Sequence, residues 1–277
     1  MSLQSKLATV LIAAVAVMGL IALRAGITGS AAARMKYGSA KPAPAGSPPT
    51  PVLVELFTSE GCSCCPPADA LLSRLGKTQP VPGADIIALE EHVDYWDRLG
   101  WKDPFSSEAA TERQNEYDQT FAGGQAYTPQ MIVDGHAKFV GSSDSDALRA
   151  ISAASQARKA AVQLSWEEGD TLAIHIEPLA SAGKNVSGQL YLAVAENMLH
   201  SDVKHGENAG RALEHNGVVR QLLPIAKMEA SPQGFSSSVA VHAAREWNRA
   251  NLRAVVFVQD RGSNRVLAAA AIPFPKA

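Results

Sequence analysis

The chain has 277 residues, with 25 Lys and Arg against 27 Asp and Glu, for a formal net charge of −2. This charge and an aromatic content of 6% argue against nucleic acid as a partner, because such proteins carry basic surfaces and stacking platforms. The length suits two domains, and a hydrophobic content of 46% is sufficient for packed cores.

An apolar run occupies residues 7–23 and small residues follow at 30–33. The pattern predicts a secretory signal peptide cleaved near Ala33, or an uncleaved membrane anchor, over residues 1–33. The proline-rich residues 34–50 predict an extended linker, which would tether the folded part if the anchor stays. Both interpretations indicate a periplasmic or secreted protein, in a compartment where disulfides persist. If the segment is an uncleaved anchor, the protein would be attached to the inner membrane.

Residues 51–160 predict an α/β domain in which strands and helices alternate. The expected elements are strand 52–57, helix 68–76, strand 85–90, helix 107–120, strands 130–133 and 138–140, and a helix from 144 to about 159. Asp134 and Gly135 predict a hairpin turn between the last two strands. The expected order is therefore β-α-β-α-β-β-α.

All three cysteines lie between the first predicted strand and the first predicted helix. Cys62 and Cys65 have the C-x-x-C spacing of a redox pair. The amide-rich start of a helix favours a thiolate, which makes a cysteine there reactive. We expect Cys62 to be the exposed attacking thiol and Cys65, or alternatively Cys64, to resolve the mixed disulfide.

Two carboxylates are candidates for proton transfer near these thiols. Glu55 stands inside the apolar strand, where burial would make it a proton acceptor for Cys65. The alternative is that Glu55 points to solvent or into a salt bridge. Asp69 lies one helical turn past Cys65, and we expect it to act mainly through electrostatics at the helix end.

The loops that follow later strands supply further candidates. His92 and Trp96 follow the second strand, at the sheet edge where α/β proteins bind ligands. They would line a substrate groove, or His92 would be the third ligand of a metal site; the alternative is a structural loop packed by Trp96. Thr128 and Pro129 precede a strand, either with a cis bond in a tight turn or with a trans proline at the strand start.

Residues 161–277 alternate apolar and polar side chains in several short segments. These segments predict strands at 162–166, 171–177, 188–196, 218–223, 235–241, 252–258 and 265–272. They indicate an antiparallel β-sandwich domain without a catalytic constellation. His200, His205 and His215 lie in a polar stretch at irregular spacing, which favours a solvated loop over a metal site.

The stretch from Val54 to Asp69 resembles the exported thioredoxin-like family catalogued as domain of unknown function 1223. The stretches 92–96, 100–105 and 127–130 are similar to other parts of that family. The resemblance implies a thioredoxin-like domain over residues 51–160, with a cis-proline at Pro129 beside the disulfide. This chain departs from the family in having Cys64 in place of a small residue, and in the acidic pair before His92.

Together these observations predict a thiol–disulfide oxidoreductase that acts on exported protein or small thiol substrates and exchanges electrons with a redox partner. We expect no metal or other cofactor, because no Cys or His pairs stand at zinc-finger spacing. One alternative is a Cu(I)-binding carrier that uses Cys62, Cys64 and Cys65, since closely spaced thiolates suit Cu(I). Another is a non-enzymatic envelope adaptor whose disulfide is structural.

Overall fold

The computed structural model describes residues 48–121, 124–179, 187–229, 231 and 233–275. The predicted signal or anchor and nearly all of the predicted linker therefore lie outside the described residues. Within the described ranges, no helix is both long and apolar enough to span a bilayer.

The first seven predicted elements are present in the predicted order. They are β1 (Thr50–Thr58), α2 (Pro66–Thr78), β2 (Ala84–His92), α3 (Glu108–Thr120), β3 (Gln130–Val133), β4 (Ala137–Val140) and α4 (Asp144–Ala154). Ser107 caps α3 by accepting a hydrogen bond from the Ala110 amide. Helix α4 ends before the predicted Lys159, whose ammonium instead lies 2.6 Å from the buried Asp134 carboxylate.

The second half of the chain consists of strands, two of which were not predicted. They are β5 (Val162–Glu167), β6 (Thr171–Ile176), β7 (Ser187–Glu196), β8 (Leu199–Asp202), β9 (Ala212–His215), β10 (Val218–Glu229), β11 (Phe235–Ala240), β12 (Leu252–Asp260) and β13 (Val266–Pro273). Strands β8 and β9 pair with each other where a solvated loop was expected. The prediction for this stretch was wrong, because His215 is buried within the hairpin.

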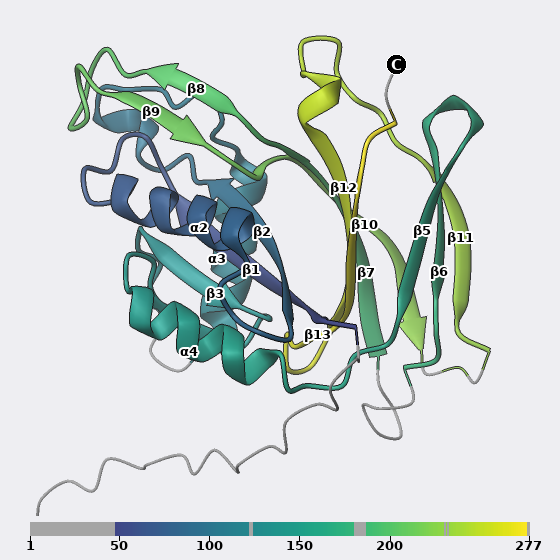
Figure 1. Cartoon of the computed structure of the whole chain (residues 1–277). Coiled ribbons are helices and arrows are strands. Elements are labelled where there is room, and N and C mark those ends of the chain that lie inside the picture. The colour runs from purple at the N-terminus through teal and green to yellow at the C-terminus, as the bar shows by residue number, and fades with distance from the viewer. Residues whose placement is uncertain (1–47, 122–123, 180–186, 230, 232, 276–277) are drawn as a thin grey trace, which may run out of the picture. The chain divides into compact units, whose positions relative to one another are not determined.

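The fold is mostly β, with a large mixed sheet and few helices. The eight-stranded sheet has the order β13-β12-β7-β10-β2-β1-β3-β4, and a three-stranded sheet has the order β11-β6-β5. Strand β2 pairs in parallel with both β1 and β10. The large sheet therefore crosses the predicted domain boundary at residues 160/161 without a break (Figure 1). The division into an α/β domain and a separate sandwich stays a prediction.

The two faces of β1 pack against different partners, because successive side chains of a strand point in opposite directions. Val54 and Leu56 pack against Leu72 of α2 in one buried cluster. Leu53, on the other face, belongs to a cluster that also contains Phe257 of β12. This alternation decides which residues can reach the start of α2, where the cysteines lie.

Candidate functional site

The cysteine loop connects the end of β1 to the start of α2. Cys65 is the N-cap of α2, and prolines occupy the first helical positions. Cys62 and Cys65 form a disulfide with their Cα atoms 5.4 Å apart. Both residues are fully buried. The predicted C-x-x-C pair is therefore bonded, and its sulfurs are covered.

Cys64 is the exposed thiol of the loop. Its Sγ atom lies 3.3 Å from the Sγ atom of Cys62, which is van der Waals contact between the two sulfurs. The expectation that Cys62 is exposed was wrong. Cys62 is fully buried, and its backbone is held by the loop between β8 and β9, where buried Asn208 donates hydrogen bonds to the carbonyl oxygens of Glu60 (2.8 Å) and Cys62 (2.9 Å).

Three other predicted site residues form a group that contacts Cys64 through Thr128. The Thr128 carbonyl oxygen is 3.7 Å from the Cys64 sulfur, and the Thr128–Pro129 peptide bond is cis. The Trp96 indole N–H donates a hydrogen bond of 2.8 Å to the Thr128 hydroxyl. The exposed sulfur thus lies beside the peptide carbonyl of Thr128, and the half-buried Trp96 ring is held by the side chain of the same threonine.

Glu55 lies on the other face of β1 from Val54 and Leu56, and so away from α2. Its carboxylate accepts hydrogen bonds from the Arg113 guanidinium (2.5 Å) and the Tyr117 hydroxyl (2.5 Å). No hydrogen bond within the described residues joins it to a cysteine. Glu55 is a buried ion-pair partner of α3, and we do not assign it to proton transfer at Cys65.

A buried group of charged side chains lies behind the cysteine loop. The Nδ1 atom of His92 is 2.7 Å from an Asp103 carboxylate oxygen. The Nδ1 atom of His215 is 2.7 Å from Glu90 Oε1, and its Nε2 atom is 3.2 Å from Glu60 Oε1. The two imidazole rings cross edge to face with their centroids 4.7 Å apart. His92 therefore belongs to an interior network and does not line a groove.

This network shifts the protonation of its members. Burial opposes charge on His215, but the Glu90 carboxylate and the hydrogen bond to Glu60 raise the pKa of His215 to about 9. Burial alone would raise the pKa of Glu90, but the charge of His215 lowers it to about 2. Burial likewise opposes charge on His92, while Asp103 holds the pKa of His92 well above its usual value.

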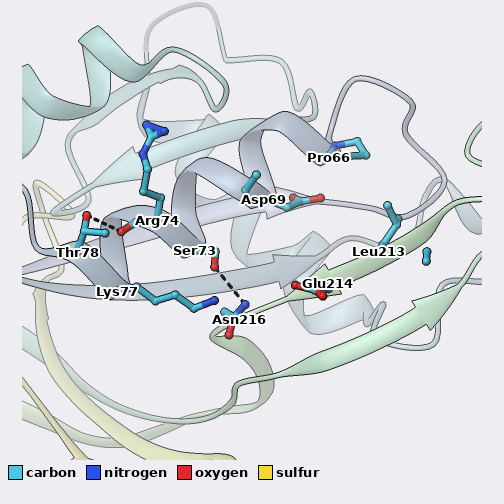
Figure 2. Close-up of a pocket in the computed structure, with 11 residues that line it drawn as sticks. Pro66, Asp69, Ser73, Arg74, Lys77, Thr78, Leu213, Glu214 and Asn216 are labelled. Atoms are coloured by element: carbon cyan, nitrogen blue, oxygen red, sulfur yellow. Dashed lines mark hydrogen bonds between the residues drawn. The ribbon is translucent and has the colours of Figure 1, made fainter.

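Asp69 is buried, and the Thr58 hydroxyl donates a 2.6 Å hydrogen bond to it. Burial, reinforced by the nearby charge of Glu90, raises the pKa of Asp69 to about 7. Asp69 also reaches the wall of a groove of about 500 Å³ between α2 and the β9 hairpin strand (Figure 2). The groove is lined by Pro66, Asp69, Ala70, Ser73, Arg74, Lys77, Thr78, Ala212, Leu213, Glu214 and Asn216.

Comparison with known protein families gives one match: the model of the family described as "Protein of unknown function (DUF1223)" matches residues 53–259 of this chain. The chain belongs to the DUF1223 family. No curated protein matches this DUF1223 chain.

Two solved structures resemble this DUF1223 protein. A structural-genomics crystal structure of an Agrobacterium tumefaciens protein is 25% identical, with a TM-score of 0.65, and the match covers 83% of this chain and 97% of that one. HBP35 of Porphyromonas gingivalis is 16% identical, with a TM-score of 0.60, and the match covers 84% and 77% of the two chains. At that identity the second likeness shows the fold alone.

Most of the buried network could not be expected from the sequence patterns described above. The acidic pair before His92 was noted only as a departure from the family, although ionisable residues at the end of an apolar strand are a signal of a buried polar site. The alternation in β9 was a second signal, because Leu213 and His215 are buried while Ala212 and Glu214 are exposed. No local pattern in the sequence indicates that His215 of β9 lies next to Glu90 of β2.

Proposed function

We propose that this protein is a thiol–disulfide oxidoreductase in which exposed Cys64 connects a substrate with the buried Cys62–Cys65 disulfide. The observation that carries the proposal is the 3.3 Å contact between the sulfurs of Cys64 and Cys62. Thiol–disulfide exchange requires an attacking thiolate to reach a disulfide sulfur. Of the three cysteines, Cys64 alone is open to solvent, so a protein-sized substrate would meet it first.

The exchange would take place in two stages. The Cys64 thiolate attacks the Cys62 sulfur, the Cys62–Cys64 bond forms, and Cys65 leaves as a thiolate that takes up a proton. A substrate thiolate then attacks the exposed Cys64 sulfur and releases Cys62. The second substrate thiol closes the substrate disulfide and releases Cys64. The substrate loses two electrons and the protein gains them, and the reverse sequence reduces a substrate disulfide.

Asp69 is a better candidate than Glu55 for the proton transfer at Cys65. It lies one helical turn past Cys65 in α2, on the same side of the helix. Its pKa is raised to about 7 by burial, near the value that suits a general acid or base at neutral pH. Glu55, in contrast, is held by Arg113 on the opposite face of β1.

We further propose that residues 51–160 are thioredoxin-like and that the protein acts outside the cytoplasm on exported proteins or small thiols. The order of the first seven elements, the C-x-x-C pair at the start of α2 and the position of Thr128 beside Cys64, directly before Pro129 and β3, support the first statement. The apolar run at residues 7–23 supports the second. A redox partner would restore the starting state.

The test is an insulin-reduction assay with single serine variants of the three cysteines. Cys62→Ser and Cys65→Ser are expected to abolish reduction, because each removes half of the disulfide. Cys64→Ser is expected to slow it about tenfold or more, since a buried sulfur must then be attacked directly. If Cys64→Ser has no effect, the role of Cys64 is wrong. If all three variants reduce insulin at the wild-type rate, the oxidoreductase proposal fails.

Contact among three sulfurs also favours a second candidate function, a Cu(I) carrier. After reduction, Cys62, Cys64 and Cys65 would offer closely spaced thiolates, the ligands that Cu(I) prefers. Reduced protein mixed with one equivalent of Cu(I) and a competing chelator tests this function. Loss of all copper to the chelator would exclude the carrier. If a Cys65→Ala variant then also traps no partner, an envelope adaptor with a structural disulfide is favoured over the oxidoreductase.

A further inference from the structure

We propose that Glu90, His92 and His215 form a binding site for a divalent transition-metal ion of the zinc class. One ligand atom from each residue lies within 4.8 Å of the others, and all three residues are buried. Glu90 and His92 are two residues apart on β2 and so share a face, and His215 comes from β9. Two imidazole nitrogens and one carboxylate oxygen are ligands that Zn²⁺ binds in proteins.

The first argument is the unpartnered nitrogen of His92. Its Nδ1 atom is held by Asp103 at 2.7 Å, while its Nε2 atom is buried without a hydrogen-bond partner among the described residues. A buried nitrogen without a partner is costly in a folded protein. A metal-binding histidine usually donates a hydrogen bond from one ring nitrogen to a carboxylate. This contact orients the ring and leaves the other nitrogen free to bind the metal.

The second argument is that His215 repeats this arrangement. Its Nε2 atom is 3.2 Å from Glu60 Oε1, and its Nδ1 atom is 2.7 Å from Glu90 Oε1. Each imidazole therefore has one nitrogen next to a supporting carboxylate and the other directed toward Glu90. In the metal-bound protein, the ion would replace the proton that His215 and Glu90 share, and the 2.7 Å between their two atoms would widen to the separation of about 3.4 Å between two ligands of a tetrahedral Zn²⁺ ion.

The third argument is distance and charge. Glu90 Oε1 lies 3.5 Å from His92 Nε2, close to the separation of about 3.4 Å between two ligands of a tetrahedral Zn²⁺ ion. The carboxylates of Glu60, Glu90 and Asp103 surround two imidazoles. A dication that displaces one proton from each imidazole leaves the charge of the buried cluster unchanged, so its binding adds no unbalanced charge to the interior.

An entry route and a structural consequence follow from the neighbouring contacts. The Asn216 amide donates a 2.9 Å hydrogen bond to Glu90, and its side chain donates to Ser73 at the groove between α2 and β9 (Figure 2). The groove therefore reaches the wall of the cluster. A metal here would link β2 to the β8–β9 hairpin, whose Asn208 holds the Cys62 carbonyl.

The experiment uses the full chain with the Cys62–Cys65 disulfide intact and Cys64→Ser, so that no free thiol competes for metal. Isothermal titration with Zn²⁺ is expected to show one ion per chain. His92→Gln and His215→Gln are expected to abolish binding, and Asp103→Asn to weaken it about 10–100-fold. The matched control is His200→Gln, an exposed histidine of the same hairpin, which is expected to bind like the parent.

A second measurement does not depend on folding of the variants. Zn²⁺ is titrated into the parent protein while the ring nitrogens of its histidines are followed by NMR, and those of His92 and His215 are expected to shift. Absence of stoichiometric binding, equal binding by His92→Gln, or shifts confined to other histidines would each overturn the site. None of these readouts uses disulfide exchange, so the site and the proposed function fail or hold separately.

Discussion

At the scale of single residues, burial decides which groups can react. Cys62 and Cys65 have the spacing of a redox pair, but only Cys64 meets solvent. Glu55 and Asp69 are both buried carboxylates near the cysteine loop in sequence, and the structure separates them. Glu55 is neutralised by Arg113, whereas the hydrogen bond to Asp69 comes from an uncharged hydroxyl. Asp69 is therefore the carboxyl that can exchange a proton near neutral pH.

Asp69 also predicts a pH dependence of stability. A carboxyl pKa raised to about 7 in the folded state means that the fold prefers the protonated form, so stability is lost as the pH rises from about 4 to about 7. Asp69→Asn removes this loss and keeps an oxygen for Thr58. We expect it to raise the free energy of unfolding at pH 8 by on the order of 4 kcal/mol and to change it little at pH 4. Urea unfolding at both pH values measures this.

The same variant separates stability from chemistry. If Asp69 handles the proton at Cys65, Asp69→Asn is more stable than the wild type at pH 8 yet slower in insulin reduction. An equal change of stability at both pH values would show that the pKa of Asp69 is the same in the folded and unfolded protein, against the expected burial effect. An unchanged reduction rate would remove Asp69 from the proposed mechanism and leave the stability prediction intact.

At the scale of elements, α3 is attached to the large sheet by an ion pair in addition to apolar packing. Arg113 of α3 is buried among the rings of Tyr117, Tyr191 and Phe257. Its charge is compensated by Glu55 of β1 at 2.5 Å and by Glu91 of β2 at 3.4 Å. Glu55 also accepts a hydrogen bond from the buried Tyr117 hydroxyl. Loss of the Glu55 charge would weaken both contacts in a buried site, which is costly.

Glu55→Gln is therefore expected to lower the free energy of unfolding by about 3 kcal/mol. The insulin-reduction rate per folded molecule should stay at the wild-type value, since Glu55 has no part in the proposed exchange. The control is Glu116→Gln, an exposed carboxylate of the same helix, which should leave the unfolding curve unchanged. A loss of exchange without a loss of stability would return Glu55 to the role of proton acceptor.

At the scale of the whole molecule, the two halves of the chain share one sheet and one of the buried apolar clusters. Strand β2 of the first half pairs with β10 of the second. Leu53 and Leu89 of the first half pack with Val255 and Phe257 of the second in one buried cluster. A fragment that ends at the predicted boundary would expose this apolar surface to water, which removes the main source of its stability.

We accordingly expect a fragment of residues 48–160 to lack a cooperative unfolding transition, whereas the full chain unfolds in a single one. Circular dichroism and tryptophan fluorescence, followed against urea concentration, test both statements. Coincident curves from the two probes would support a single cooperative unit in the full chain. A cooperative transition in the fragment would instead support two independently folding domains.

Local patterns in the sequence were sufficient for much of this protein. The alternation of apolar runs, the Asp134–Gly135 turn and the C-x-x-C spacing predicted elements that the structure contains, because these features depend on neighbours along the chain. The bond between Cys62 and Cys65 is equally local, since the two residues frame the start of one helix.

Only the tertiary structure decided the environment of each reactive group. The loop between β8 and β9 bonds to the Cys62 carbonyl through Asn208. Strand β9 carries His215 to Glu90, which is 125 residues away in the sequence. Glu55 lies on the face of β1 that contacts Arg113. Asp69 lies in the first turn of α2, close to the cysteines. Burial and pairing set the charge and reactivity of such groups, and they depend on contacts between distant segments that short-range periodicity does not encode.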